Sequence, residues 1–385
     1  MFSSITIRQN HPAMDLGLIA EALVFYQDTH VVANHPSLDF LLRAMTPEVF
    51  IEMLESGYLN VTYEPGYMAV ATTKTGTGHE WHTARYAQNI TRDPLPEWLP
   101  KLFREIIGTP GKSERMADRA LRKIGIAGHS AQLLDEAMTE FTNPDYTEPA
   151  ADVILRTLAP TYIHSGPLIF EVSRNGDMLI VHSNIDFLKA SSSPASLLGW
   201  LLEVKVDLFF AAKFGAEIAS DHMNAKLMQL RLNTALARYG DSQLAIERFQ
   251  EFVFNDARAI GQAVTSGGRT FRDLIRILER ARKFKGWLRD KPLDADLLKQ
   301  YFEETTKPTW IDSLPCKSYR WFILSGLGLA IEALGAEGLG TAAGLALSAA
   351  DTFLLDKLLR GWKPNQFVNG PLHELVHRPA EPVHS

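Results

Sequence analysis

The chain has 385 residues, of which 46% are hydrophobic and 22% are charged, and its formal net charge is −6 at pH 7. This length predicts two domains, and the composition excludes a chain that is largely disordered. The weakly negative charge excludes a protein that is basic overall, so any nucleic-acid site would have to be a local patch.

Strand patterns occur in residues 1–190 and alternate with helical patterns. Short strands are predicted at 4–8 and 29–33. One hairpin is predicted to join 58–63 to 67–72 through Glu64-Pro65-Gly66. A second hairpin is predicted to join 168–173 to 177–182 through Arg174-Asn175-Gly176, because Asn-Gly favours a tight turn.

Apolar residues at helical spacing predict seven helices in the same region, with Ser37 and Thr46 as expected N-caps. These helices are expected at 14–26, 37–45, 46–56, 95–107, 113–124, 130–141 and 148–158. Together with the strands they indicate an α+β fold, with an N-terminal mixed domain over residues 1–190.

Beyond residue 193 the strand patterns disappear, which predicts an all-helical domain over residues 191–362. Its helices are expected at 194–214, 222–239, 243–254, 271–289 and 293–304. Asp241, Thr270 and Asp294 stand near three of the helix starts and are expected to cap them. Residues 363–385 are rich in proline and are predicted to form a tail.

An apolar block at 321–359 is rich in alanine and glycine and predicts a helical hairpin at the end of this domain. Small residues such as Gly340, Gly344 and Ser348 would let helices approach closely, in a soluble core or in lipid. Each arm has about 12 uncharged residues, roughly 20 Å of helix, which is shorter than a bilayer core of about 30 Å. We therefore favour a soluble core and keep membrane insertion as the alternative.

The stretch 269–291 predicts a basic amphipathic helix. Its expected binding patch consists of Arg269, Arg272, Arg276, Arg280, Lys283 and Arg289. The expected apolar side consists of Phe271, Leu274, Ile275, Leu278 and Ala281. Such a helix can bind phosphate, anionic lipid or an acidic protein surface. The alternative is a solvated face whose charges pair with acidic residues such as Glu303 and Glu304.

The tail contains one metal-binding pattern, His373-Glu374-Leu375-Val376-His377. In zinc hydrolases this spacing places His373 and His377 on one helix face and lets Glu374 polarise a bound water. Prolines on both sides leave room for only a short helix. A zinc-dependent hydrolase with Glu374 as its catalytic residue is therefore the alternative function, and no metal or other cofactor is expected.

Three further patterns are expected to be structural. His79 and His82 lie three residues apart but have no third ligand near them. Gly108 to Ser113 resembles a phosphate-binding loop, yet Gly108 is better interpreted as the end of one helix and Thr109-Pro110 as the start of the next. Arg122 and His129 have the spacing of an arginine–histidine pair in some helical nucleases. Gly125 and Gly128 lie between them and disfavour the continuous helix that such a pair needs.

The last tenth of the chain resembles uncharacterised bacterial proteins that are associated with phage-defence gene clusters. The resemblance rests on the segments 338–344, 350–355 and 361–367, the last being Gly-Trp-Lys-Pro-Asn-Gln-Phe. It implies a bacterial protein with an effector or accessory role and no particular activity.

These features together favour a non-enzymatic protein that acts through its surfaces, with a possible role in antiviral defence as the resemblance implies. The single cysteine, Cys316, excludes an intrachain disulfide and a cysteine zinc cluster, and it favours a cytoplasmic location. The expected partner is another protein. An anionic membrane, reached on activation, and nucleic acid are the alternative partners.

Overall fold

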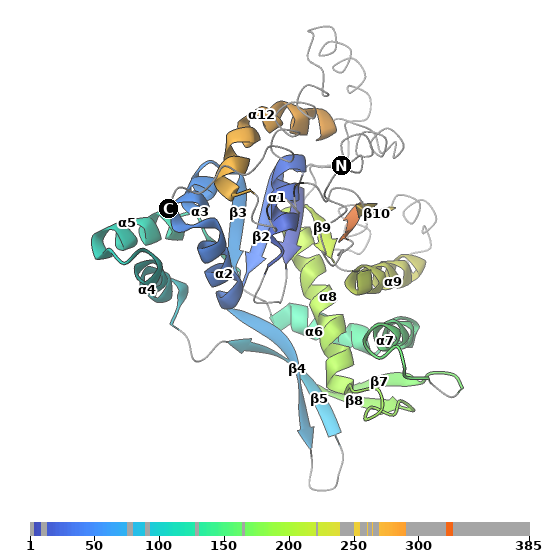
Figure 1. The fold of residues 1–385 in the computed structure, drawn as a ribbon. Helices are drawn as coiled ribbons and strands as arrows, with labels where there is room; N and C mark the ends of the chain where they lie inside the picture. The colour runs from blue at the N-terminus through green and yellow to red at the C-terminus, as the bar shows by residue number, and fades with distance from the viewer. Residues whose placement is uncertain are drawn as a thin grey trace.

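The computed structural model describes residues 4–8, 14–74, 80–88, 93–127, 131–163, 166–220, 222–238, 250–254, 260, 264, 269–289 and 321–325. Helices and two β-sheets make up most of these ranges (Figure 1). The predicted α+β class is therefore confirmed.

The larger sheet has the strand order β10-β11-β9-β1-β2-β3-β6. Its strands are β1 (Ser4–Arg8), β2 (Asp28–Ala33), β3 (Leu59–Tyr63), β6 (Gly125–Ile126), β9 (Glu217–Ser220), β10 (Gln250–Phe254) and β11 (Trp321–Ser325). β9, β1, β2, β3 and β6 are parallel, whereas β11 is antiparallel to β9 and to β10. The carboxyl ends of five strands therefore meet at one edge of the sheet.

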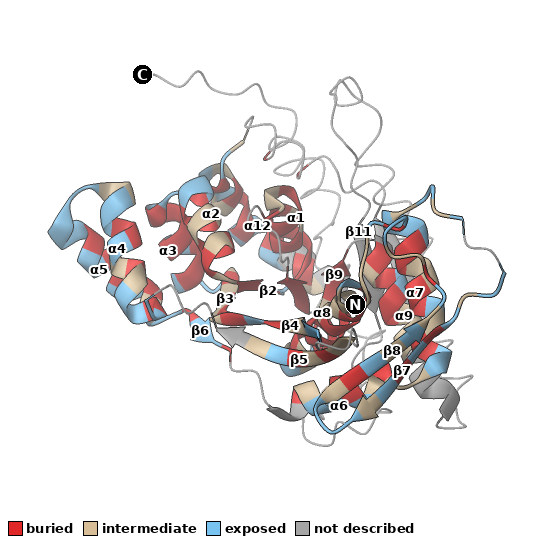
Figure 2. Cartoon of the chain, turned by 90° about the horizontal axis from the view of Figure 1, so that it is seen from below, coloured by how far each residue is buried: buried red, intermediate tan, exposed pale blue. Residues whose placement is uncertain are grey.

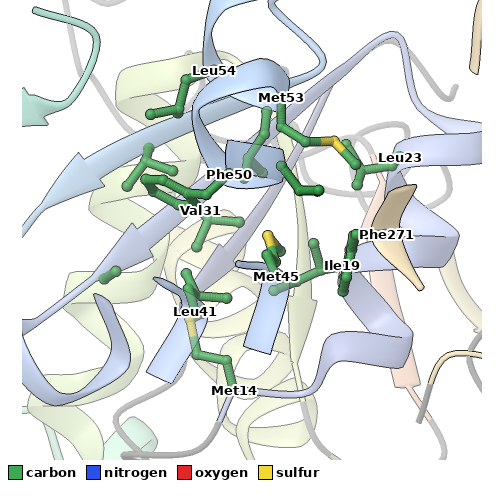
Figure 3. Packing of buried hydrophobic residues seen from close by; sticks show 14 of the residues in the cluster. Met14, Ile19, Leu23, Val31, Leu41, Met45, Phe50, Met53, Leu54 and Phe271 are labelled. Atoms are coloured by element: carbon green, nitrogen blue, oxygen red, sulfur yellow. The ribbon is translucent and has the colours of Figure 1, made fainter. Parts of the chain in front are cut away.

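One face of this sheet is covered by helices from both ends of the chain. They are α1 (Leu16–Phe25), α2 (His35–Met45), α3 (Pro47–Glu55) and α12 (Phe271–Arg289). Ile19, Leu41, Phe50 and Phe271 are buried between them and form part of one core (Figure 3). Because side chains alternate along a strand, Ile5, Ile7 and Val31 face this same core.

The opposite face of the larger sheet is covered by α8 (Pro194–Phe214), with the smaller sheet beyond it (Figure 2). The smaller sheet is antiparallel in the order β4-β5-β8-β7. Its strands are β4 (Gly66–Lys74), β5 (Glu80–Gln88), β7 (Phe170–Asn175) and β8 (Met178–Ser183). α6 (Ala131–Phe141), α7 (Pro144–Leu158) and α9 (His222–Arg238) complete a second core on this side.

Two further helices, α4 (Leu95–Ile107) and α5 (Pro110–Leu121), pack against each other and against α3. Gly108 ends α4 in the left-handed conformation, with φ of 77°, and its N–H bonds to the carbonyl of Arg104. Pro110 then occupies the first turn of α5. The predicted helix end and restart at this position are confirmed.

The predicted hairpin at 58–72 is wrong, although both strands exist. β3 pairs with β2 and β6 in the larger sheet, whereas β4 pairs with β5 in the smaller one. The N–H of Glu64 still donates to the carbonyl of Ala33, so parallel pairing continues past the end of β3. Pro65 has no N–H to continue the ladder, and the chain leaves the larger sheet there. The second predicted hairpin is confirmed, with Asn175 paired to Met178 and φ of 60° at Gly176.

The expectation that no sheet occurs beyond residue 193 is also wrong, because β9, β10 and β11 all lie there. Residues 250–254 are a strand where a helix was predicted, and 321–325 are a strand at the start of the predicted helical hairpin. Their sequences, QEFVF and WFILS, are rich in aromatic and β-branched residues that favour strands. Because β9 pairs with β1, main-chain hydrogen bonds cross the predicted boundary at residue 190.

Several predicted caps also differ. The side chain of Asn34, rather than Ser37, caps α2 by accepting a hydrogen bond of 3.1 Å from the Ser37 N–H. Thr46 precedes α3 with a positive φ and makes no side-chain cap hydrogen bond. Asp241, Asp294, the helix predicted at 293–304, the remainder of the apolar block after 325 and the tail 363–385 lie outside the described residues.

Candidate functional site: the basic face of α12 and the carboxyl ends of the parallel strands

The start of α12 is held by a reciprocal cap, as the sequence predicts for Thr270. The N–H and hydroxyl of Thr270 donate to Asp273 Oδ2 at 3.0 and 2.7 Å. In return, the N–H of Asp273 donates to Thr270 Oγ1 at 3.3 Å. This arrangement satisfies backbone groups that would otherwise have no partner in the first turn of the helix.

The inner side of α12 packs against α1 and α3. Its buried apolar residues are Phe271, Leu274, Ile277, Leu278 and Ala281. The sequence predicted four of these five, while Ile275 is partly buried beside the same core. The buried side fixes the rotation of the helix, so the opposite side must face outward.

Three arginines of the predicted patch, Arg272, Arg276 and Arg280, are exposed along that outer side. Their spacing of four residues places them in one row. Arg269 is partly buried just before the helix. The side chains of Lys283 and Arg289 lie outside the described part of the structure. The structure therefore brings together three of the six predicted patch residues on one surface.

In the described part of the chain, acidic groups near the row compensate only part of its charge. Arg276 pairs with Asp273 at 3.2 Å, but the arginine side chain is 70% exposed, so the pair is screened by water. The positive charge of Arg272 also helps to lower the pKa of Glu48 of α3. The pKa of Glu48 is lowered chiefly by its 2.7 Å hydrogen bond from Lys112 of α5. Glu303 and Glu304, the acidic neighbours proposed from the sequence, lie outside the described residues.

Lys285 belongs to the same basic stretch but lies on the inner side of α12. It is only 4% exposed, and burial lowers its pKa to about 8, although Asp28 of β2 opposes this shift. The basic stretch therefore divides into an exposed arginine row and an inward-facing lysine. Helical periodicity could have indicated this, because position 285 follows Leu274, Leu278 and Ala281 on the apolar side.

A second cluster of charges lies at the carboxyl ends of the parallel strands. Arg8 ends β1, Glu64 follows β3, and Glu203 and Asp207 lie one turn apart on α8. Arg8 Nε and Nη2 donate to the two carboxylate oxygens of Glu64 at 2.9 and 3.1 Å. Arg8 Nη1 donates to Glu203 Oε2 at 2.6 Å and to Asp207 Oδ1 at 2.8 Å.

This cluster, which we call the Arg8 cluster, is almost completely buried, and only Glu203 keeps a partly exposed side chain (19%). Burial, together with the charges of Glu203 and Glu64, raises the pKa of Asp207 to about 7, and Arg8 opposes this shift. Burial alone would lower the pKa of Arg8, but its three carboxylate neighbours hold it well above the ordinary value. The site combines one guanidinium with three carboxylates.

The position of the Arg8 cluster follows from the topology. From β1 the chain continues to β2 and β3 on one side of β1, whereas β9 lies on its other side. The order of the strands in the sheet therefore reverses at β1. In open α/β sheets, ligands commonly bind outside the carboxyl ends of the strands at such a point of reversal. No pattern in the sequence indicates this cluster, because Arg8 and Asp207 are 199 positions apart.

The described residues of the other sequence patterns have structural roles. His82 is buried in the smaller sheet, 3.0 Å from the hydroxyl of Thr72, and burial lowers its pKa. Ser113 donates to the carbonyl of Thr109 within α5. Among the described residues, no three His, Cys, Asp or Glu side chains are placed to hold a metal.

His79, His129 and the metal-binding pattern of His373, Glu374 and His377 lie outside the described residues. None of the helices in the described ranges combines the length and apolar character that crossing a bilayer requires. Comparisons with protein-family models, curated proteins and solved structures gave no match.

Proposed function

We propose that this protein is a binding protein that contacts an acidic protein partner through the arginine row of α12, formed by Arg272, Arg276 and Arg280. The observation that carries the proposal is the exposure of these three side chains on a helix whose other side is buried in the core. The row is therefore presented on a rigid support. From the resemblance of the C-terminal residues we extend the proposal to an accessory role in bacterial defence.

The energetics of the row favour a bound anionic group. Like charges four residues apart on a helix repel each other by roughly 0.2–0.5 kcal/mol per pair, and a partner's negative charges would relieve this repulsion. Each guanidinium can also bind a carboxylate through two parallel hydrogen bonds. The row therefore costs a little stability in the free protein and offers directional contacts in a complex.

A protein partner fits this surface better than an extended polyanion. The formal net charge of −6 repels a membrane or nucleic acid that spreads over the molecule. Nearby acidic residues, including Asp273 and Glu48, add to this local repulsion. An acidic patch on a folded partner would meet only the row, whose three arginines span about 12 Å along the helix.

The first prediction tests this surface with the full chain and three probes: poly-L-glutamate, phosphatidylserine vesicles and duplex DNA. We expect wild type to bind poly-L-glutamate at low salt. The triple variant R272E/R276E/R280E should bind it at least tenfold more weakly because three attractions become repulsions. Circular dichroism should be unchanged, because exposed charges contribute little to stability.

A charge-matched control is the triple variant R115E/R122E/K123E, which alters exposed residues of the α5 region. It should keep most of the binding. Equal losses in both variants would show that total charge, and not the α12 row, decides binding. Binding of wild type to vesicles or DNA but not to poly-L-glutamate would overturn the choice of an acidic protein as partner.

A further inference from the structure

β4 is an edge strand of the smaller sheet and is paired on one side only. Its ladder with β5 runs from Gly66 to Lys74 without a bulge. Two side-chain contacts add to this ladder, from Thr72 to His82 and from Lys74 to Glu80, and both partners also belong to β5. No other hydrogen bond reaches β4 from the described part of the chain. Every second residue of β4 therefore directs its N–H and C=O groups to a side on which the described structure has no strand.

The later part of β4 is exposed. Gly66 and Met68 are buried, whereas Thr72, Thr73 and Lys74 are exposed. Among the described helices, α8 is the main neighbour of β4, and it covers the face of the strand that carries Met68. The far end of the hairpin extends away from the body of the fold (Figure 1). The helices of the described part therefore cover a face of β4 and leave its outer edge open.

The sequence of β4 lacks the features that usually protect a sheet edge, which are charges, proline, bulges or a very short strand. The other described edge strands have such features, since β6 has two residues, β7 carries Glu171 and Arg174, and β10 carries Glu251. β4 has nine residues, more than the usual length of about five or six, and no charge or proline occurs before Lys74. Its edge is therefore suited to pairing with a further strand.

We propose that β4 pairs with β4 of a second copy of this chain, antiparallel and centred on Val70, so that the two four-stranded sheets become one continuous sheet. In this register Val70 lies opposite the partner's Val70, and Ala69 lies opposite the partner's Ala71. Tyr67 lies opposite the partner's Thr73, an aromatic and β-branched pair of the kind that stabilises sheets. The same surface is used by both copies, so the pairing closes as a dimer.

The only charged residue of β4 favours this orientation. In the antiparallel register Lys74 lies opposite the partner's Gly66, and the two lysines are about 27 Å apart along the strands. A parallel pair would place the two lysines side by side, where like charges are destabilising. The strand is therefore complementary to itself in the antiparallel direction, and no charge meets a like charge across the pair.

Sedimentation velocity of the full chain from about 1 to about 100 μM tests the pairing, because small interfaces are often weak. Wild type should sediment as a dimer at the upper concentrations. A69E/A71E should raise the dissociation constant about tenfold or more, because each new carboxylate faces another across the pair. A wild-type chain that stays monomeric overturns the proposal, and so does a dimer that A69E/A71E leaves unchanged.

The matched control is A69E/A71K, which alters the same two positions. Each carboxylate at position 69 then faces an ammonium group at position 71 of the partner, so the dimer should persist. Within one chain, Ala69 lies opposite Arg85 and Ala71 opposite Thr83 of β5. The carboxylate at position 69 therefore has the same arginine beside it in both variants, and their circular dichroism should agree. Equal dissociation of the two variants overturns the proposed register.

Cysteine cross-linking tests the centre of the register without adding charge. In a C316S background, which removes the single cysteine of the chain, V70C should form an intermolecular disulfide under mild oxidation. Residues directly opposite each other have Cα atoms about 4.5–5.5 Å apart, which suits a disulfide. T72C would face the partner's Met68 and should cross-link much more slowly, and equal rates overturn the register. R272E/R276E/R280E should leave the dimer intact, so failure of this proposal and of the proposed function are distinguishable.

Discussion

Arg8 links two layers of the fold, the larger sheet and α8, through its side-chain ion pairs. Its guanidinium satisfies carboxylates from α8 and from the turn after β3, while its own strand is central in the larger sheet. A buried ion pair adds little stability compared with well-packed apolar residues, but removal of one partner leaves buried charges uncompensated. The role of Arg8 is therefore best tested by removing it.

We predict that R8M destabilises the protein by about 3–5 kcal/mol at pH 8, the range measured when one partner of a buried pair is removed. The loss should be smaller at pH 5.5, because the pKa of Asp207 is raised to about 7 and its carboxyl is then protonated. Urea unfolding at both pH values measures the difference. R156M removes an exposed arginine that pairs with Asp152 on the surface of α7 and should change stability little. An equal loss at both pH values would contradict this explanation.

At the scale of the element, α12 depends on its cap. We predict that T270A lowers the free energy of unfolding by about 1 kcal/mol, because the hydroxyl no longer accepts from the Asp273 N–H. T157A is the matched control, since Thr157 is an exposed residue of α7 whose hydroxyl only bonds back to the carbonyl of Val153. Urea midpoints of the two variants should differ, and equal midpoints would show that the cap contributes nothing.

How far an element could be predicted depended on where its partners lie in the sequence. The pattern of α12 is local, because its buried and exposed residues alternate every three or four positions, and the arginine row was predicted with it. β9 has only four residues, Glu-Ile-Ala-Ser, and is paired on both sides, so its sequence shows no alternation. The Arg8 cluster has no local pattern either, because strand order and the packing of α8 bring together members that lie far apart in the sequence.

At the scale of the whole molecule, the predicted boundary at residue 190 can be tested directly. Three elements beyond residue 190 complete the structure of the N-terminal region. β9 pairs with β1 in the larger sheet, α12 packs into one core and α8 into the other. We predict that a fragment of residues 1–190 lacks a cooperative thermal transition, because β1 would have an open edge, one face of the larger sheet would lose α8 and the other would lose α12. Calorimetry of the fragment beside the full chain measures this. A sharp transition in the fragment would show that the N-terminal domain folds alone.

The pairing of β1 with β9 has a consequence for synthesis of the chain. Arg8 leaves the ribosome about two hundred residues before its helix partners and the strand β9. At ordinary translation rates the delay is roughly 10–40 s. During that time one edge of a central strand that is buried in the folded protein has no neighbour, and such edges promote aggregation. The nascent chain should therefore depend on chaperones until α8 and β9 have emerged, which makes expression yield sensitive to translation speed between these two points.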